Sequence, residues 1–301
     1  METLLNTFQT AARLPWHRLV SEIAALLADP AVQVPERLVQ PLPGGGSLFV
    51  MPALDGRIAI AKLITFTPAN TGTRRPAIQG NVVVFDVATG ERLLLLDGPT
   101  VTARRTAAVS LLAAQRLAPT PNGPLLIVGA GAQGLAHLEA FAQGLPLREV
   151  RIASRSVASA RALAERARIL GLQASIVTDA DAALAHCPLV VTCTPASGVV
   201  LSGPLRGDAF VAAVGAFTPQ MVELSPALCR TCAERGSVFV DTPDAAHEAG
   251  DLLQARLDVA RFASLRDVVM GSAAAARGPV LFKSCGWAGW DLAAARVAIS
   301  S

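Results

Sequence analysis

A short apolar run that ends in the pattern Gly-x-Gly-x-x-Gly is the feature that most constrains the fold of this chain. Residues 124–134 read Pro-Leu-Leu-Ile-Val-Gly-Ala-Gly-Ala-Gln-Gly, and an Ala-rich helical pattern follows them. Gly129 permits a tight turn, Gly131 lets backbone amides approach a pyrophosphate, and Gly134 lets the helix pack closely on the strand. A β-like run at 149–153 and a helical pattern at 157–170 follow at βαβ spacing. The segment predicts a dinucleotide-binding turn, in which Ala132 and Gln133 also contact the cofactor.

The residues after the second predicted strand indicate which dinucleotide binds. An NAD site usually places Asp or Glu here, about 20 residues past the glycines, to bind the ribose hydroxyls. This chain instead has Ser154, Arg155 and Ser156. No carboxylate repels a 2′-phosphate, and a guanidinium flanked by two hydroxyls suits that group. We therefore expect NADPH as the cofactor and NADH as a weaker substitute, with a merely solvated loop arginine as the alternative interpretation of Arg155.

Composition excludes several classes of protein. No apolar run is long enough to span a membrane, and the N-terminal residues lack the basic and apolar regions of a signal peptide, so we expect a cytoplasmic protein without membrane contact. The net charge of +3 is too small to indicate nucleic-acid binding. Five cysteines, an odd number, argue against a disulfide framework. Cys229 and Cys232 form a Cys-x-x-Cys, but no second ligand pair completes a zinc set, so no metal site is predicted. The absence of tyrosine excludes the Tyr-x-x-x-Lys proton donor of short-chain dehydrogenases.

Two patterns of secondary structure follow one another along the chain. Residues 1–28 read as one or two helices, alternating runs then predict an antiparallel sheet, and a helix is expected at 102–117. The alternating runs lie at 48–51, 58–66, 82–87 and 92–96. From residue 125 onward, β and α patterns alternate, which predicts a parallel, doubly wound sheet. We therefore expect an α/β chain with a Rossmann domain and a second α+β domain. Ligands of such sheets bind at the carboxyl ends of strands, which places Thr194 and Val214 near the cofactor.

The two lysines of the chain, Lys62 and Lys283, stand among 26 basic residues that are otherwise arginine. Lys62 lies inside an apolar β-like run, where a lysine must be exposed at an edge or buried with a partner. A structural carboxylate or a substrate carboxylate would serve as that partner. Arg37 and Arg105 lie in the same apolar-rich part of the chain. The three cations together suggest an anionic substrate.

At this point the chain resembles a known family, the ornithine cyclodeaminase and mu-crystallin family, over most of its length. The motifs that carry the resemblance are Met51-Pro-Ala53, the strand with Lys62, Asn70, Asp97-Gly98, Thr102-Ala-Arg-Arg-Thr-Ala-Ala108, the glycine fingerprint with Gln133, Val214-Gly-Ala216, Glu223-Leu224 and Phe282-Lys-Ser-Cys-Gly286. The resemblance implies a substrate-binding and dimerisation domain at residues 1–118 and 281–301, an NADP-binding domain at 119–280, and a homodimer.

The resemblance also implies roles for single residues. Arg37, Met51, Lys62 and Arg105 would contact the substrate, with Lys62 as the group that transfers a proton. Arg105, Thr106 and Ser284 would lie near the cofactor.

One departure from the family pattern separates its members. Cyclodeaminases carry an aspartate in the loop after the Val-Gly strand, whereas this chain has Phe217 there. The departure disfavours the lyase and favours the reductases of cyclic ketimines, which convert Δ1-pyrroline-2-carboxylate and Δ1-piperideine-2-carboxylate to L-proline and L-pipecolate. Three alternatives stay open: ornithine cyclodeaminase, reductive amination of a 2-keto acid as in the family's alanine dehydrogenases, and NADPH binding without catalysis as in crystallins.

Overall fold

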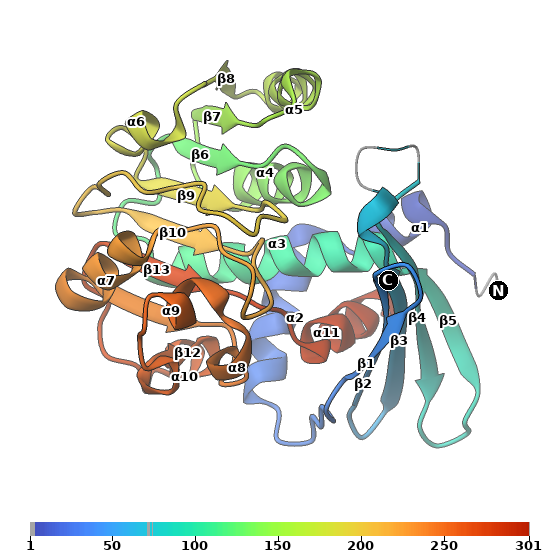
Figure 1. Cartoon of the computed structure of the whole chain (residues 1–301). Coiled ribbons are helices and arrows are strands. Elements are labelled where there is room, and N and C mark those ends of the chain that lie inside the picture. The colour runs from blue at the N-terminus through green and yellow to red at the C-terminus, as the bar shows by residue number, and fades with distance from the viewer. Residues whose placement is uncertain (1–3, 71–72, 74, 301) are drawn as a thin grey trace. The chain divides into compact units, whose positions relative to one another are not determined.

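The chain divides into two compact units. The computed structural model describes residues 4–70, 73 and 75–300 (Figure 1). The first unit comprises Met1–Arg105 and Trp287–Ser301, and the second comprises Thr106–Gly286. The division falls within one helix, α3 (Gly98–Leu117), and not after residue 118, and the chain returns to the first unit at Trp287 and not at residue 281. The functions predicted for the two domains stay predictions. Residues 1–3, with which the predicted helical segment 1–28 and the predicted domain 1–118 begin, lie outside the described residues.

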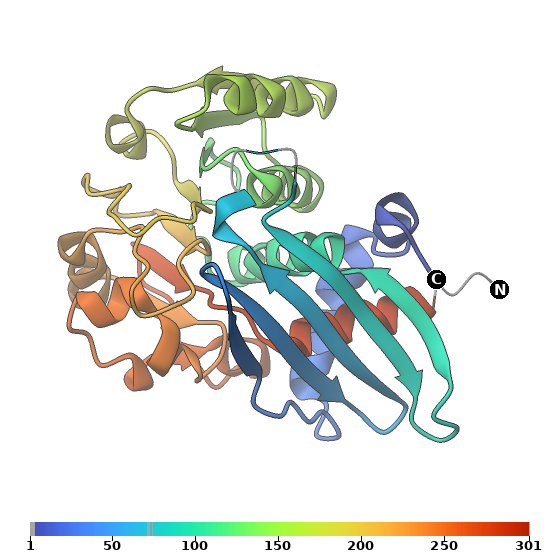
Figure 2. The same ribbon diagram turned by 45° about the vertical axis from the view of Figure 1, so that its right-hand side comes forward.

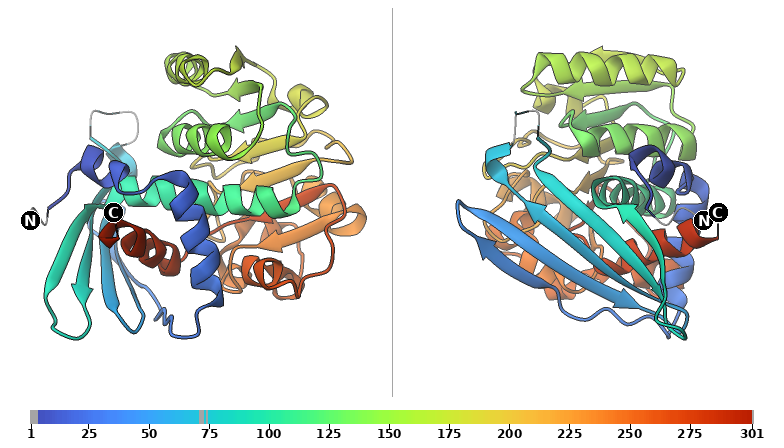
Figure 3. Two further views of the ribbon diagram at one scale, coloured as in Figure 1. Left: turned by 180° about the vertical axis from the view of Figure 1, so that it is seen from behind. Right: turned by 90° about the vertical axis from the view of Figure 1, so that its right-hand side faces the viewer.

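An antiparallel sheet forms the framework of the first unit, as the alternating runs predict. Its five strands lie in the order β1-β2-β3-β4-β5, and Figure 2 shows the broad face of this sheet. The elements of the unit are α1 (Thr7–Ala12), α2 (Trp16–Ala28), β1 (Leu38–Leu42), β2 (Gly46–Leu54), β3 (Ile58–Phe66), η1 (Pro68–Asn70), β4 (Ile78–Asp86), β5 (Arg92–Asp97) and α11 (Ala288–Ile299). The last of these packs against β2, β3 and α2, so that α11 lies between α2 and the sheet (Figures 1 and 3).

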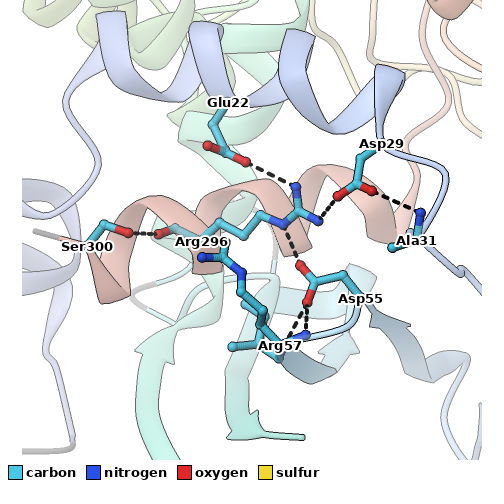
Figure 4. Close-up of polar contacts among 8 residues, drawn as sticks. Glu22, Asp29, Ala31, Asp55, Arg57, Arg296 and Ser300 are labelled. Carbon is cyan, nitrogen blue, oxygen red and sulfur yellow. Dashed lines mark hydrogen bonds and ion pairs between the residues drawn. The ribbon is translucent and has the colours of Figure 1, made fainter.

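A buried arginine fastens α11 to its neighbours in the first unit (Figure 4). The guanidinium of Arg296 donates from Nε to Asp55 Oδ2 at 2.6 Å and from Nη2 to Asp29 Oδ2 at 2.6 Å. Its Nη1 donates to Glu22 Oε1 at 3.2 Å. One side chain of α11 thus reaches α2, the residue that follows α2, and the turn between β2 and β3.

A doubly wound parallel sheet forms the second unit, which confirms the predicted Rossmann architecture. The strand order is β12-β11-β13-β10-β9-β6-β7-β8, and every pairing in it is parallel. The elements after α3 are β6 (Leu125–Val128), α4 (Ala132–Gly144), β7 (Glu149–Ala153), α5 (Val157–Ile169), β8 (Gln173–Ile176), α6 (Ala180–Leu184), β9 (Leu189–Thr192), β10 (Phe210–Ala213), α7 (Pro226–Arg235), β11 (Ser237–Val240), α8 (Ala245–Glu248), α9 (Gly250–Gln254), η2 (Val259–Arg261), β12 (Ala263–Ser264), α10 (Leu265–Met270) and β13 (Val280–Lys283). The order reverses between β6 and β9, which is the switch point where such sheets bind ligands.

The core of the second unit consists of its central strands, with helices on both faces of the sheet (Figure 3). Every residue of β6, β9, β10 and β13 is buried, because both faces of a parallel sheet are covered. Strands of this kind are therefore nearly continuous apolar runs in sequence. Cys229 and Cys232 lie on α7 in this core, and burial raises the pKa of the Cys232 thiol to about 12. Among the described residues, no cluster of His, Cys, Asp and Glu could hold a metal ion. None of the helices that the structure describes combines the length and apolar character needed to cross a membrane.

Candidate active site

Lys62 is fully buried in the middle of the antiparallel sheet. It lies on β3, the central strand, in register with Met51 of β2 and Val82 of β4. Alternation along β3 turns Ile60, Lys62 and Ile64 toward the face that α11 covers, and Lys62 is only 1% exposed. The exposed-edge interpretation of this lysine is therefore wrong. Met51, a predicted substrate contact, is also buried.

The partner of Lys62 is a structural carboxylate, one of the two expected alternatives, but the sequence did not indicate which residue supplies it. Asp291 lies in the first turn of α11 and is completely buried. Lys62 Nζ donates to its Oδ1 at 3.2 Å and its Oδ2 at 3.1 Å. Arg105 Nε, also buried, donates to Asp291 Oδ1 at 3.3 Å. A single carboxylate in a helix that is apolar apart from Arg296 was the available signal, since a buried Asp needs a charged partner.

Positive charge exceeds negative charge in this cluster. Lys62 and Arg105 share the single carboxylate of Asp291, and among the described residues neither cation has a second one within ion-pair distance. Burial lowers the pKa of Lys62 to about 8; Asp291 opposes that shift, while the charges of Arg105 and Arg37 add to it. Arg37, half-buried just before β1, is thus electrostatically coupled to the cluster. A buried excess of positive charge favours binding of an anion.

In the second unit, the glycine fingerprint forms the turn between β6 and α4. Gly129 has a φ of +111°, and a Cβ added there would lie 2.9 Å from the Cys193 carbonyl oxygen. A Cβ on Gly134 would lie 2.1 Å from the Gly129 carbonyl oxygen. Gly131 begins α4 with no side-chain cap and has open space where its Cβ would be. The first amides of α4, including Ala132 and Gln133, therefore lie at an uncapped helix N-terminus, which suits a pyrophosphate.

The loop after β7 carries the residues predicted to select NADPH. Ser156 caps α5 by accepting a hydrogen bond from the Ser159 amide at 3.2 Å, and its own amide donates to Ser154 Oγ at 3.2 Å. Arg155 is exposed, and its guanidinium has no ion-pair partner among the residues described. The loop thus presents a free cation beside a helix N-terminus. This arrangement fits a 2′-phosphate.

A buried glutamate joins the loops after β9 and β10. The amide and hydroxyl of Thr194 donate to Glu223 Oε1 at 2.6 and 2.9 Å, and the Gly215 amide donates to Oε2 at 2.6 Å. Val214, the other predicted cofactor neighbour, is buried, and its amide donates to the Thr192 carbonyl at 2.9 Å. Glu223 had no predicted site role. The signal that could have revealed it was a carboxylate inside the apolar segment Met-Val-Glu-Leu.

Two more predicted cofactor neighbours are also buried in the described structure. Ser284, directly after β13, donates from Oγ to Asp241 Oδ2 at 2.8 Å, and the same oxygen accepts the amides of Cys285 and Gly286. Thr106 lies on α3 at the start of the second unit. Their contacts with a cofactor stay predictions. The structure therefore brings Lys62 and Arg105 together in the first unit, and it places the fingerprint, Thr194, Val214 and Ser284 at strand ends of the second.

The sequence matches proteins of known function over almost its full length. It is 40% identical to Δ1-pyrroline-2-carboxylate reductase 1 of Burkholderia multivorans over 98% of this chain and 94% of that protein. It is 39% identical to the Δ1-pyrroline-2-carboxylate/Δ1-piperideine-2-carboxylate reductase of Azospirillum brasilense, again over 98% and 94%.

Solved structures show the same fold. The Δ1-pyrroline-2-carboxylate reductase of Thermococcus litoralis, in complex with NADH and L-proline, superposes with a TM-score of 0.92 at 23% identity over 99% of this chain and 97% of that one. An archaeal alanine dehydrogenase dimer with bound NAD gives a TM-score of 0.88 at 22% identity, over 99% and 95%. The model of the ornithine cyclodeaminase/mu-crystallin family matches residues 20–300. The chain therefore belongs to the ornithine cyclodeaminase/mu-crystallin family.

Proposed function

We propose that this chain reduces Δ1-pyrroline-2-carboxylate and Δ1-piperideine-2-carboxylate to L-proline and L-pipecolate, with NADPH as the hydride donor. The observation that carries the proposal is the buried cluster of Lys62, Arg105 and Asp291, whose charge is unbalanced without an anion. Two full-length relatives that are 39–40% identical support the choice of substrate, since both are named for Δ1-pyrroline-2-carboxylate and one of them also for Δ1-piperideine-2-carboxylate.

The cations of the first unit bind the substrate carboxylate. Arg105 and Arg37 hold it, since a guanidinium offers paired donors that match a carboxylate. Asp291 accepts hydrogen bonds from both Lys62 and Arg105 and so holds the two cations next to each other. Binding of the substrate anion offsets the charge that Arg105 and Lys62 place together in a buried site.

Lys62 controls the proton that the reaction consumes. Reduction adds hydride to C2 of the ring, and the electron pair of the C=N bond moves to nitrogen, which must carry a proton. With a pKa of about 8, Lys62 is mostly protonated near neutral pH yet releases its proton more readily than an exposed lysine. It delivers that proton to the imine nitrogen, directly or through water, and Asp291 stabilises the charged form of Lys62.

The second unit holds the cofactor, which supplies hydride when bound. The α4 N-terminus binds the pyrophosphate, because Gly131 leaves room above the uncapped amides. Arg155, with Ser154 and Ser156, binds the 2′-phosphate and so favours NADPH over NADH. Relatives of known structure bind NADH or NAD, and the arginine loop is the observation that favours the phosphorylated form here.

The chain also forms a homodimer through the open face of its antiparallel sheet. Leu38, Val50 and Leu63 lie in register across β1, β2 and β3, so their side chains share that face. Leu38 is 56% and Leu63 is 42% exposed. An apolar row on an open sheet favours association with a second copy, and the archaeal alanine dehydrogenase of similar fold is a dimer. Light scattering of the purified chain tests the proposed dimer. A molar mass equal to that of a monomer at working concentration would exclude it.

A panel of substrates tests the reaction. Oxidation of NADPH is followed with the five- and six-membered cyclic imines, with pyruvate plus ammonia, and with ornithine. We expect turnover with the imines. Turnover with pyruvate and ammonia alone would identify an alanine dehydrogenase, and ammonia release from ornithine without net cofactor oxidation would identify a cyclodeaminase. NADPH binding without turnover of any substrate would identify a binding protein.

A further inference from the structure

Glu223 holds two loops of the second sheet that lie side by side at the carboxyl ends of β9 and β10. Its side chain is completely buried, and each carboxylate oxygen serves a different loop. Oε1 accepts the amide and hydroxyl of Thr194, and Oε2 accepts the amides of Gly215 and Ala216 at 2.6 and 3.3 Å. The two loops also approach each other closely at Gly215, where an added Cβ would lie 2.1 Å from the Thr194 carbonyl oxygen. The two loops are therefore fixed to each other through one carboxylate.

A second layer of buried charge fixes Glu223 itself. The amides of Glu223 and Leu224 donate to Asp251 Oδ1 at 2.6 and 2.8 Å, and Asp251 Oδ2 lies 2.7 Å from Lys283 Nζ. Asp251 and Lys283 are both fully buried. Burial raises the pKa of Glu223, while the charge of Lys283 and the hydrogen bonds from Thr194 act in the opposite direction. Burial would lower the pKa of Lys283, but the charges of Asp251 and Glu223 outweigh it and raise that pKa.

Burial of several charged groups in one network costs desolvation free energy. We therefore expect this network to have a role beyond packing. The strands it serves belong to one half of the doubly wound sheet. Of the two mononucleotide-binding halves, β6, β7 and β8 form the half with the glycine fingerprint and the arginine loop, which takes the adenosine side of the cofactor. The other half, which contains β9, β10 and β13, takes the nicotinamide side. Thr194, Gly215 and Lys283 all lie at the carboxyl ends of strands in this second half.

We propose that Glu223 is a positioning residue for the nicotinamide half of the dinucleotide: by holding the Thr194 and Gly215 loops in one arrangement, it shapes the surface on which the nicotinamide ring binds. The inference rests on the proposed function, because it requires a nicotinamide cofactor. Glu223 acts through the two loops, and Asp251 with Lys283 holds Glu223 in place.

Binding of two ligands to the same variants tests this role. NADPH contains both halves of the dinucleotide, whereas 2′,5′-ADP contains only the adenosine half with its 2′-phosphate. Glu223→Gln keeps the size of the side chain but loses one acceptor oxygen, and Glu223→Asp keeps the charge but withdraws it from both loops. For either variant, we expect calorimetry to show that the affinity for NADPH is lower by a factor of about ten or more. The affinity for 2′,5′-ADP is expected to equal that of wild type. Thr194→Val, which removes a single donor, is expected to shift NADPH binding in the same direction by less.

Asp181 provides the matched control. It accepts the amides of Ser202 and Gly203 and the hydroxyl of Ser202, so Asp181→Asn removes bonds of the same kinds from another loop of the same unit. This variant is expected to bind both ligands as wild type does. Equal weakening of NADPH and 2′,5′-ADP in the Glu223 variants would show a general structural role and overturn the proposal, as would unchanged NADPH binding. Failure of the wild-type chain to bind NADPH would overturn the proposed function as well.

Discussion

Asp291 and Arg296 lie on the same helix, α11, between one and two turns apart, and each makes a buried ion pair with a different part of the first unit. Asp291 contacts Lys62 on β3, and Arg296 contacts Asp55 in the turn between β2 and β3. The helix therefore carries both a group that holds the proposed catalytic lysine and a group that holds the helix itself. Because Arg296 fixes α11 against the sheet, it also fixes the carboxylate that Lys62 requires.

Replacement of Arg296 is expected to destabilise the first unit strongly. Arg296→Met leaves Asp55, which is 4% exposed, without its guanidinium partner, and breaking a buried pair costs about 3 kcal/mol or more. Urea unfolding measures the change. Arg168→Met is the control, because Arg168 pairs with Glu165 on the surface of α5, where an ion pair contributes less than about 1 kcal/mol. Equal losses in the two variants would show that the Arg296 cluster contributes no more than a surface pair.

Replacement of Lys62 is expected to remove imine reduction. Lys62→Met deletes the buried ammonium that contacts Asp291, and loss of a proton-transferring group typically lowers turnover by about 100-fold or more. Steady-state kinetics with Δ1-pyrroline-2-carboxylate measure the loss. Binding of NADPH should be unchanged, since the fingerprint lies in the other unit. A variant with full activity would exclude Lys62 from the chemistry.

The pH dependence of the reaction should report the titration of Lys62. Burial lowers the pKa of this lysine to about 8, so kcat/KM is expected to fall as pH rises through that value. Asp291 opposes the effect of burial, and Asp291→Asn should therefore shift the fall to lower pH. Profiles of kcat/KM for wild type and variant, at saturating NADPH, give the two midpoints. Identical midpoints would show that another group titrates.

The sequence was sufficient to predict the parallel, doubly wound sheet of the second unit because its signals are local, although it assigned most of β13 to the other domain. Continuous apolar runs mark strands buried on both faces, and glycines mark positions where a side chain has no room, as at Gly134. β1 was not predicted: its sequence, Leu-Val-Gln-Pro-Leu, contains a proline and is largely exposed at the edge of the sheet. Proline is tolerated on an edge strand but reads as a break in sequence.

The partners of buried charges could not be predicted in the same way. Lys62 and Asp291 are 229 positions apart, and Arg105 and Asp291 are 186 positions apart. A lone buried charge in a sequence shows that a partner is required, but the fold decides which one it is. The prediction of a substrate carboxylate as partner was thus incomplete, because Asp291 already occupies one side of Lys62.

The preference for NADPH should depend on Arg155. Arg155→Gln removes the exposed guanidinium at the start of α5, and loss of a charged hydrogen bond to the 2′-phosphate should lower kcat/KM for NADPH about tenfold. The value for NADH should change little, since NADH lacks this phosphate. Arg161→Gln is the control, because Arg161 is also exposed but lies on α5 beyond its first turn. Parallel losses with both cofactors would assign Arg155 a structural role.

Stability at mildly acidic pH should depend on His137. Its ring is fully buried between α4 and α3: Nδ1 lies 2.8 Å from the Gln133 carbonyl oxygen and Nε2 lies 2.9 Å from Ser110 Oγ. Burial lowers the pKa of His137 from 6.5 to about 4. Between these two values the unfolded chain binds a proton that the folded chain does not, so the free energy of unfolding falls as pH falls.

The size of this effect can be measured by chemical denaturation. Between about pH 7.5 and pH 5.5, His137 should account for a loss of about 1 kcal/mol in the free energy of unfolding. His137→Gln removes the titrating ring, so the variant should lose correspondingly less over the same interval, although it is less stable at the higher pH. His186→Gln replaces an exposed histidine of the same unit and should retain the wild-type pH dependence. If His137→Gln also retained it, other groups would be responsible for the acid sensitivity.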